Sequence, residues 1–215
     1  MIQFNAKTDK GIQRITSPAS WRELTLGQLI KLENEWDGAD PIQLFSIITG
    51  LDVDLLENST QEGLENTMMA VCSFAYNRPQ WEELPAPSHI QIGDKVYKTP
   101  KDISKKLLGQ KIRVSQIILK SGNDLISSIP KIIAIYMQEV IDGKYDGTRI
   151  DEVEKLVMSC SAIDAYGLGQ FFFQRSSNLI NIGELSSEKS RPVIIPMKKL
   201  WNGLQRLKDS AGILT

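Results

Sequence analysis

One pattern of residues occurs twice in this chain, and the resulting duplication constrains the fold more than any other sequence feature. Residues 26–31 (LGQLIK) are echoed by residues 108–113 (LGQKIR), 82 positions later. Cys72 and Cys160 stand 88 positions apart, so an insertion of six residues between the two matches reconciles the spacings. We interpret the pattern as a divergent duplication. Chance similarity among common residues is the alternative.

Each unit is predicted to hold a β-hairpin followed by three helices. Apolar and polar residues alternate around a turn cluster at residues 2–15 and again at residues 90–97, which predicts two hairpins. Pro41 stands at the start of an apolar stretch that ends at Gly50, and Pro130 is predicted to open the equivalent helix. The other helices are predicted from a cap at Ser20 or at Thr25 to about residue 36, at residues 60–74 and 108–113, and from residue 148 onward.

These elements predict a fold that is mainly α with small β-hairpins (α+β). The two units are predicted at residues 1–78 and 89–175, joined by a proline-rich linker at residues 79–88. Serine-containing stretches at residues 176–178 and 183–190, followed by Pro192 and Pro196, predict that residues 176–215 form an extended C-terminal arm, which carries an amphipathic helix. The spacing of 82 to 88 residues between the two units is too long for the repeat of a solenoid, so we expect a paired, pseudo-symmetric arrangement.

Charge and composition exclude several classes of protein. The formal net charge is −1, so no overall basic excess indicates nucleic acid or an anionic membrane as the main partner. We find neither a secretory signal pattern nor a run of about 18 apolar residues. Cys72 and Cys160 fall in apolar stretches that read as buried helices, which is typical of thiols kept reduced in a cytosol.

The supply of chemical groups for catalysis is small. His89 is the single histidine, and no motif supports a Ser–His or Cys–His pair around it. Gly167 and Gly169 match part of a dinucleotide fingerprint but follow a predicted helix, so we expect a flexible break there. The sequence therefore predicts no catalytic residue, no cofactor and no metal ion. A hydrolase built around His89 or a converging pair of acids is a distant alternative.

Two groups of apolar residues are candidates for binding a partner. The rings of Phe171, Phe172 and Phe173 cannot all face one side of a helix, so at least one is either core or offered to a partner. The predicted C-terminal helix carries an apolar face formed by Met197, Leu200, Trp201, Leu204 and Leu207. We expect this face to bind a partner protein; docking on its own domain is the alternative. Lipid or nucleic acid could be contacted locally through Lys198, Lys199, Arg206 and Lys208.

Several short stretches resemble a family of viral proteins. They are residues 21–28 (WRELTLGQ), 45–50 (FSIITG), 92–97 (IGDKVY), 108–110 (LGQ), 133–136 (IAIY), 144–146 (KYD) and 171–173 (FFF). Together they resemble small morphogenesis proteins of tailed bacteriophages, particularly crAss-like and related phages of Bacteroides-type hosts, up to about residue 175. The resemblance implies a protein made in the bacterial host cytoplasm and destined for the virion or its assembly.

Two functions follow from this resemblance, and neither brings catalytic residues with it. The first is a non-enzymatic virion structural protein at the head–tail connector region or inside the capsid. Its expected partners are other virion or assembly proteins, including copies of itself in a ring. The second is a tail-assembly chaperone that leaves before the particle matures. Neither role involves a membrane.

Overall fold

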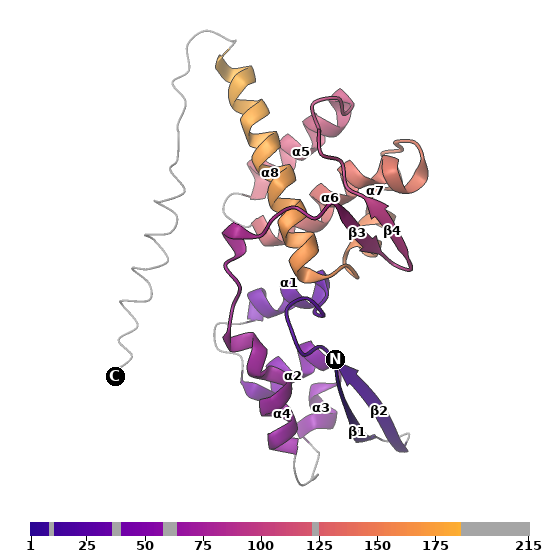
Figure 1. The fold of residues 1–215 in the computed structure, drawn as a ribbon, viewed down its shortest axis with the longest axis vertical. Coiled ribbons are helices and arrows are strands. Elements are labelled where there is room, and N and C mark those ends of the chain that lie inside the picture. Colours follow the sequence, from indigo (N-terminus) through magenta and orange to yellow (C-terminus); the bar gives the residue numbers. More distant parts are fainter. Residues whose placement is uncertain (9–10, 36–39, 58–63, 122–124, 186–215) are drawn as a thin grey trace, which may run out of the picture.

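The computed structural model describes residues 1–8, 11–35, 40–57, 64–121 and 125–185 (Figure 1). In these residues the chain forms eight α-helices and two separate antiparallel hairpins, so the predicted mainly helical α+β class is confirmed. We refer to residues 1–78 as the first half and to residues 89–185 as the second half. The first half occupies the lower part of Figure 1 and the second half the upper part.

The first half begins with the predicted hairpin. Its elements are β1 (Ile2–Thr8), β2 (Gly11–Ser17), α1 (Leu26–Glu35), α2 (Pro41–Thr49), α3 (Val53–Glu57), α4 (Leu64–Cys72) and the 3-10 helix η1 (Ser73–Tyr76). Asp40 accepts a hydrogen bond from the Gln43 amide and caps α2, while Gly50 ends α2 with a φ of 74°. Helix α3 was not predicted. The predicted start of the next helix, at residue 60, lies outside the described residues.

The second half repeats the hairpin and then departs from the prediction at one proline. Its elements are the 3-10 helix η2 (Trp81–Glu83) in the connection, then β3 (His89–Ile92), β4 (Lys95–Lys98), α5 (Leu108–Ser121), α6 (Leu125–Asp142), α7 (Ile150–Val157) and α8 (Ala162–Leu185). Pro130 lies inside α6 and does not open it, which corrects the prediction. Ile129 and Pro130 are both buried there, and this packing offsets the backbone hydrogen bond that proline removes.

Helix α8 runs unbroken where a flexible glycine break was expected. A Cβ on Gly167 would lie 2.5 Å from the backbone oxygen of Pro85, and one on Gly169 would lie 2.6 Å from a methyl carbon of Ile129. The two glycines therefore allow α8 to pack closely against its neighbours. The prediction of a break was wrong because these glycines are needed for close packing and not for flexibility.

The same helix also corrects the start of the predicted C-terminal arm. Residues 176–185 were expected in the arm but continue α8. Ser176 shares a 2.8 Å hydrogen bond with the Tyr136 hydroxyl, and Ser177 donates to the carbonyl oxygen of Phe173 at 2.9 Å. Since both hydroxyls find partners, these serines do not end the helix. Residues 186–215 lie outside the described residues.

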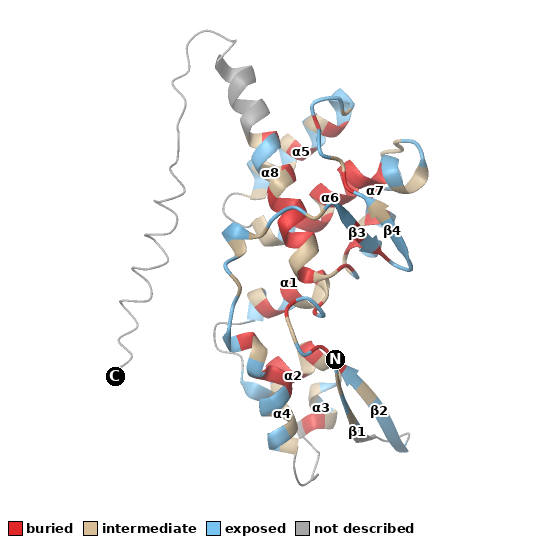
Figure 2. Cartoon of the chain, in the orientation of Figure 1, coloured by how far each residue is buried: buried red, intermediate tan, exposed pale blue. Residues whose placement is uncertain are grey.

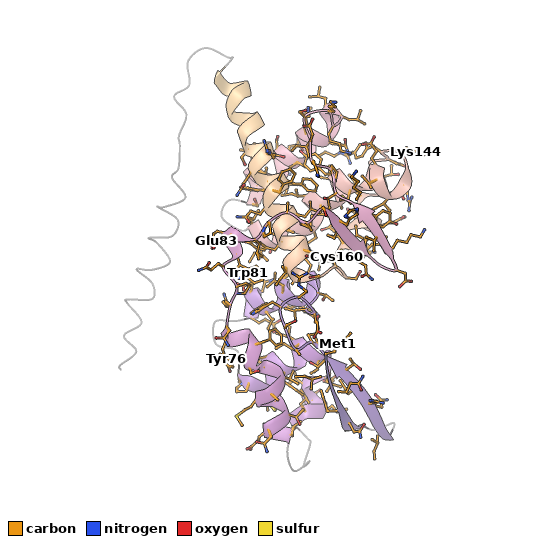
Figure 3. The ribbon with its side chains drawn as sticks, in the orientation of Figure 1. Met1, Tyr76, Trp81, Glu83, Lys144 and Cys160 are labelled. Atoms are coloured by element: carbon orange, nitrogen blue, oxygen red, sulfur yellow. The ribbon has the colours of Figure 1, made fainter. Side chains whose placement is uncertain are left out.

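A continuous hydrophobic core joins the two halves. Figure 2 shows buried stretches along α6 and the middle of α8, and the same core includes buried residues of α1 and α2. Trp81, from the predicted linker, packs between the rings of Trp21 (5.4 Å between ring centroids) and Tyr166 (4.8 Å). Figure 3 places Trp81 and Cys160 at the level where the halves meet. Residues 79–88 therefore take part in the packing between them.

The two halves share one hydrogen-bonding arrangement at matching positions. Gln28 accepts from the backbone amide of Thr25 at 2.9 Å and donates to the carbonyl of Ile48 in α2 at 2.8 Å. Gln110 accepts from the amide of Leu107 at 3.0 Å and donates to the carbonyl of Ile135 in α6 at 2.8 Å. The second hairpin strand also contacts the apolar helix in each half, β2 on α2 and β4 on α6. These shared contacts support the duplication that the sequence predicts.

Candidate protein-binding surface

The start of α1 is held at the junction between the two halves. Three backbone hydrogen bonds join it to the α7–α8 connection: Leu26 N–H to Cys160 O (2.8 Å), Gly27 N–H to Met158 O (2.9 Å) and Ala162 N–H to Leu24 O (2.7 Å). The Leu26 side chain is fully buried, and a Cβ on Gly27 would lie 3.3 Å from the Met158 oxygen. The second half therefore covers the start of α1.

The start of α5 carries the same residues and is open. Leu108 corresponds to Leu26 in the repeat, yet its side chain is 72% exposed. A Cβ on Gly109 would meet no atom within 4 Å. Among the described residues, no acceptor lies opposite the backbone amides of Leu108 and Gly109. The surface that α1 uses at the junction is thus left uncovered on α5.

The open surface continues along α5 as a row of apolar side chains. Leu108, Ile112 and Leu119 follow each other at spacings of four and seven residues, which places them on one face of the helix. Their exposed fractions are 72%, 48% and 74%, and the row is about 16 Å long. The opposite face of α5 buries Gln110 and Val114. We call Leu108, Ile112 and Leu119 the α5 row.

Positive charge surrounds the α5 row. Lys111, Arg113 and Lys120 are the only charged residues on α5, and no acidic residue lies on this helix. Residues 95–121 contain eight basic residues and one acidic residue. A partner that covers the row would therefore meet a basic rim, which favours an acidic partner surface.

Two open depressions lie near α5, and one ion pair borders each of them. The first, of about 330 Å³, lies between α5, α6 and the start of α7 and is lined by Arg113, Lys131 and Asp151. A hydrogen bond from Lys131 to Asp151 at 3.2 Å raises the pKa of Lys131. The second, of about 600 Å³, is bordered by Lys106, which pairs with Glu139 at 2.7 Å.

His89 lies on the surface, whereas the two cysteines lie in the interior. The Ser88 hydroxyl lies 3.1 Å from Nδ1 of His89, but both residues are exposed, and no described carboxylate hydrogen-bonds the ring. Cys72 and Cys160 are free and buried; burial raises the pKa of Cys72 to about 11 and that of Cys160 to about 12. A search of the described residues found no group of three His, Cys, Asp or Glu side chains placed to hold a metal ion.

The structure brings together only part of the predicted partner-binding set. Phe172 is fully buried, with its ring centroid 5.0 Å from that of Tyr136, so it has no surface for a partner and the prediction is corrected for this residue. Phe171 and Phe173 are half-buried against the core. The remaining predicted contacts lie outside the described residues: Met197, Lys198, Lys199, Leu200, Trp201, Leu204, Arg206, Leu207 and Lys208.

Sequence reasoning missed the α5 row because α5 is apolar on two sides. Val114, on the buried face, and Ile112, in the row, are only two positions apart, so the pattern resembles a helix buried all round. The signal that could have revealed the row is the repeat itself. Leu26 and Leu108 hold the same position in two units, and a single chain has only one internal junction to cover them.

Comparison of the chain with models of protein families, with curated proteins and with solved structures found no match in any of the three. Within the described residues, no helix combines the length and the apolar character that crossing a membrane requires.

Proposed function

We propose that this chain is a non-enzymatic protein that works by docking on other protein chains, as a structural component of a tailed-phage virion. Its place would be the head–tail region or the inside of the capsid. The observation that carries the docking role is the exposed α5 row, which lies on the face of α5 opposite to the buried Gln110 and Val114. The virion setting rests on the resemblance of the short stretches quoted above.

The α5 row contributes little to the stability of the chain that carries it. Leu108 and Leu119 leave about three quarters of their side-chain surface in water. Full burial of such a side chain is worth about 1.5–3 kcal/mol, so a partner that covered the row would gain several kcal/mol from it. That gain would offset part of the entropy lost on association. Exposed apolar side chains gathered on one helix face are typical of protein-binding surfaces.

Two of the stretches that resemble phage proteins contain the starts of α1 and α5. Residues 21–28 contain the start of α1, which the second half covers, and residues 108–110 contain the start of α5, which is open. Two of the seven stretches therefore fall on segments that make, or are free to make, contacts between packed units. This location supports a role in assembly.

Mass spectrometry of purified phage particles tests the proposal. We expect the chain at a fixed copy number per particle, and we expect the double variant Leu108→Gln, Ile112→Gln to be lost from particles. Ile12→Gln is the matched control, since Ile12 is 77% exposed and lies on the distant hairpin. Absence of the wild-type chain from mature particles would replace the structural role with the assembly-chaperone role. Normal incorporation of the double variant would overturn docking through the α5 row.

A further inference from the structure

We propose that the α5 row of one copy docks on the end of α4 in a second copy, so that the chain assembles head to tail. The contact between copies would use positions that match those of the internal junction, but it would be made by side chains, because η1 follows Cys72 directly and the Ala70 carbonyl already accepts from the Ser73 hydroxyl at 2.9 Å. This inference rests on the proposed docking function and names the partner of the same surface.

The internal junction joins two unlike surfaces. The start of α1 supplies one surface, and the connection between α7 and α8 supplies the other. A duplicated chain carries both kinds of surface in each half, and the internal junction uses one of each. The two surfaces that remain are the start of α5 and the end of α4. Figure 1 places α5 in the upper part of the molecule and α4 in the lower part.

The end of α4 is suited to receive an apolar row. Cys72 ends α4 and Cys160 lies in the α7–α8 connection, so the two buried cysteines mark matching positions in the repeat. Around Cys72, Met69 is 67% exposed, and Ala70 and Ser73 are also exposed. The small side chains of Ala70 and Ser73 would allow a helix to approach closely. Met69 offers a flexible apolar contact that adapts to the shape of a partner.

Charge favours this occupant over the alternatives. Residues 32–77 contain nine acidic residues and no basic one, whereas residues 95–121 contain eight basic residues and one acidic residue. Glu65, on α4, and Asp54, on α3, are exposed. Contact between the acidic first half of one copy and the basic α5 region of another brings opposite charges together.

Charge repulsion disfavours two other occupants of the α5 row. Pairing α5 with α5 across a two-fold axis would place Lys111 and Arg113 against the same basic residues of the other copy. Residues 197–208 would bring Lys198 and Lys199 to a helix that is already basic. Residues 32–77, by contrast, carry acidic residues and no basic one, so they offer an opposite charge.

A head-to-tail contact between unlike surfaces repeats from copy to copy. It closes into a ring when the rotation between neighbours divides a full turn, and otherwise continues as a filament. Each copy then uses its α5 row once and its α4 end once. Blocking either surface should stop growth.

The experiment is sedimentation velocity on the full chain at concentrations up to about 100 μM, a range that detects even weak association. We expect wild-type protein to form species larger than a dimer. Leu108→Gln with Ile112→Gln blocks the α5 row, and Met69→Lys blocks the α4 end and adds a charge that opposes the basic rim. We expect either variant alone to be monomeric. An equimolar mixture of the two retains one good contact per pair, so we expect it to form dimers and nothing larger.

Two controls match the exposure of the altered residues. Ile12→Gln matches Leu108, and Val96→Lys matches Met69, because the two side chains are 66% and 67% exposed. Both controls should assemble as the wild type does. A monomeric wild type overturns the inference, as does assembly by the Met69→Lys variant alone or a mixture that stays monomeric. If the α5 variant is lost from particles while the wild type is monomeric, the row binds a different protein, and the proposed function stands without this inference.

Discussion

The start of α1 and the start of α5 have nearly the same sequence and lie in opposite environments. Leu26 is fully buried against the α7–α8 connection, while Leu108 is 72% exposed. In both helices a glutamine, Gln28 or Gln110, donates a hydrogen bond to a carbonyl of the following apolar helix, so the local structure is the same in both. We call each of these contacts a glutamine bridge. The difference teaches that the environment of each leucine is set by what packs on it from another unit.

The largest effect expected from this comparison is on folding stability. Leu26→Ala should lower the free energy of unfolding by about 2–5 kcal/mol, because it leaves a cavity in the core. Leu108→Ala should change it by less than about 1 kcal/mol, because the side chain is already in water. Urea unfolding of both variants at low protein concentration measures the two values. Equal losses would show that the two leucines do not differ as described.

The glutamine bridges give the next largest effect and test the similarity of the halves. Gln28→Ala and Gln110→Ala each remove a side chain that both accepts from and donates to the backbone. We expect each to cost about 1–3 kcal/mol, with the larger loss for Gln110, which is fully buried. Thermal or urea unfolding provides the measurement. A loss at one site alone would argue against a shared arrangement.

A smaller effect concerns charge at the proposed contact between copies. Raising the salt concentration from about 50 mM to about 500 mM shortens the screening length several-fold. We expect the association constant of the wild-type chain to fall by about threefold to tenfold as the attraction between acidic and basic regions is screened. Sedimentation at the two salt concentrations checks this. Stronger association at high salt would show that apolar contact dominates and that charge contributes little.

The smallest effect compares the two glycines. Gly109→Ala adds a Cβ in open space on a helix, so we expect a gain in stability of about 0.5–1 kcal/mol. Gly27→Ala adds one 3.3 Å from the Met158 oxygen, which should cancel part or all of that gain. Differential scanning calorimetry on the two variants resolves the sign. Equal gains would mean that the junction at Gly27 is looser than described.

Local signals in the sequence were sufficient for much of the fold. Alternating residues around Gly93, which has a φ of 60°, predicted the second hairpin, and Pro41 at the start with Gly50 at the end predicted α2. Such features depend on turns and caps that a few neighbouring residues determine. They could therefore be predicted without knowledge of the tertiary structure.

The predictions that failed all depended on contacts between residues that are far apart in the sequence. Gly167 and Gly169 read as a break, but their role is to let Pro85 and Ile129 approach α8. Pro130 read as a helix start but lies within a buried helix, and Ser176 read as part of an arm but bonds Tyr136. The α5 row was not predicted from the sequence for the same reason. Nothing within α5 itself distinguishes a covered leucine from an open one.

Site-directed crosslinking tests the central claim most directly. Chains carrying Leu108→Cys and chains carrying Met69→Cys are mixed and treated with a short bis-maleimide. Native Cys72 and Cys160 are buried, and burial raises the pKa of both thiols, so they should react slowly. We predict covalent dimers in which residue 108 of one copy is joined to residue 69 of the other. Crosslinks between two copies of residue 108, or the absence of any covalent dimer, would contradict head-to-tail docking through the α5 row.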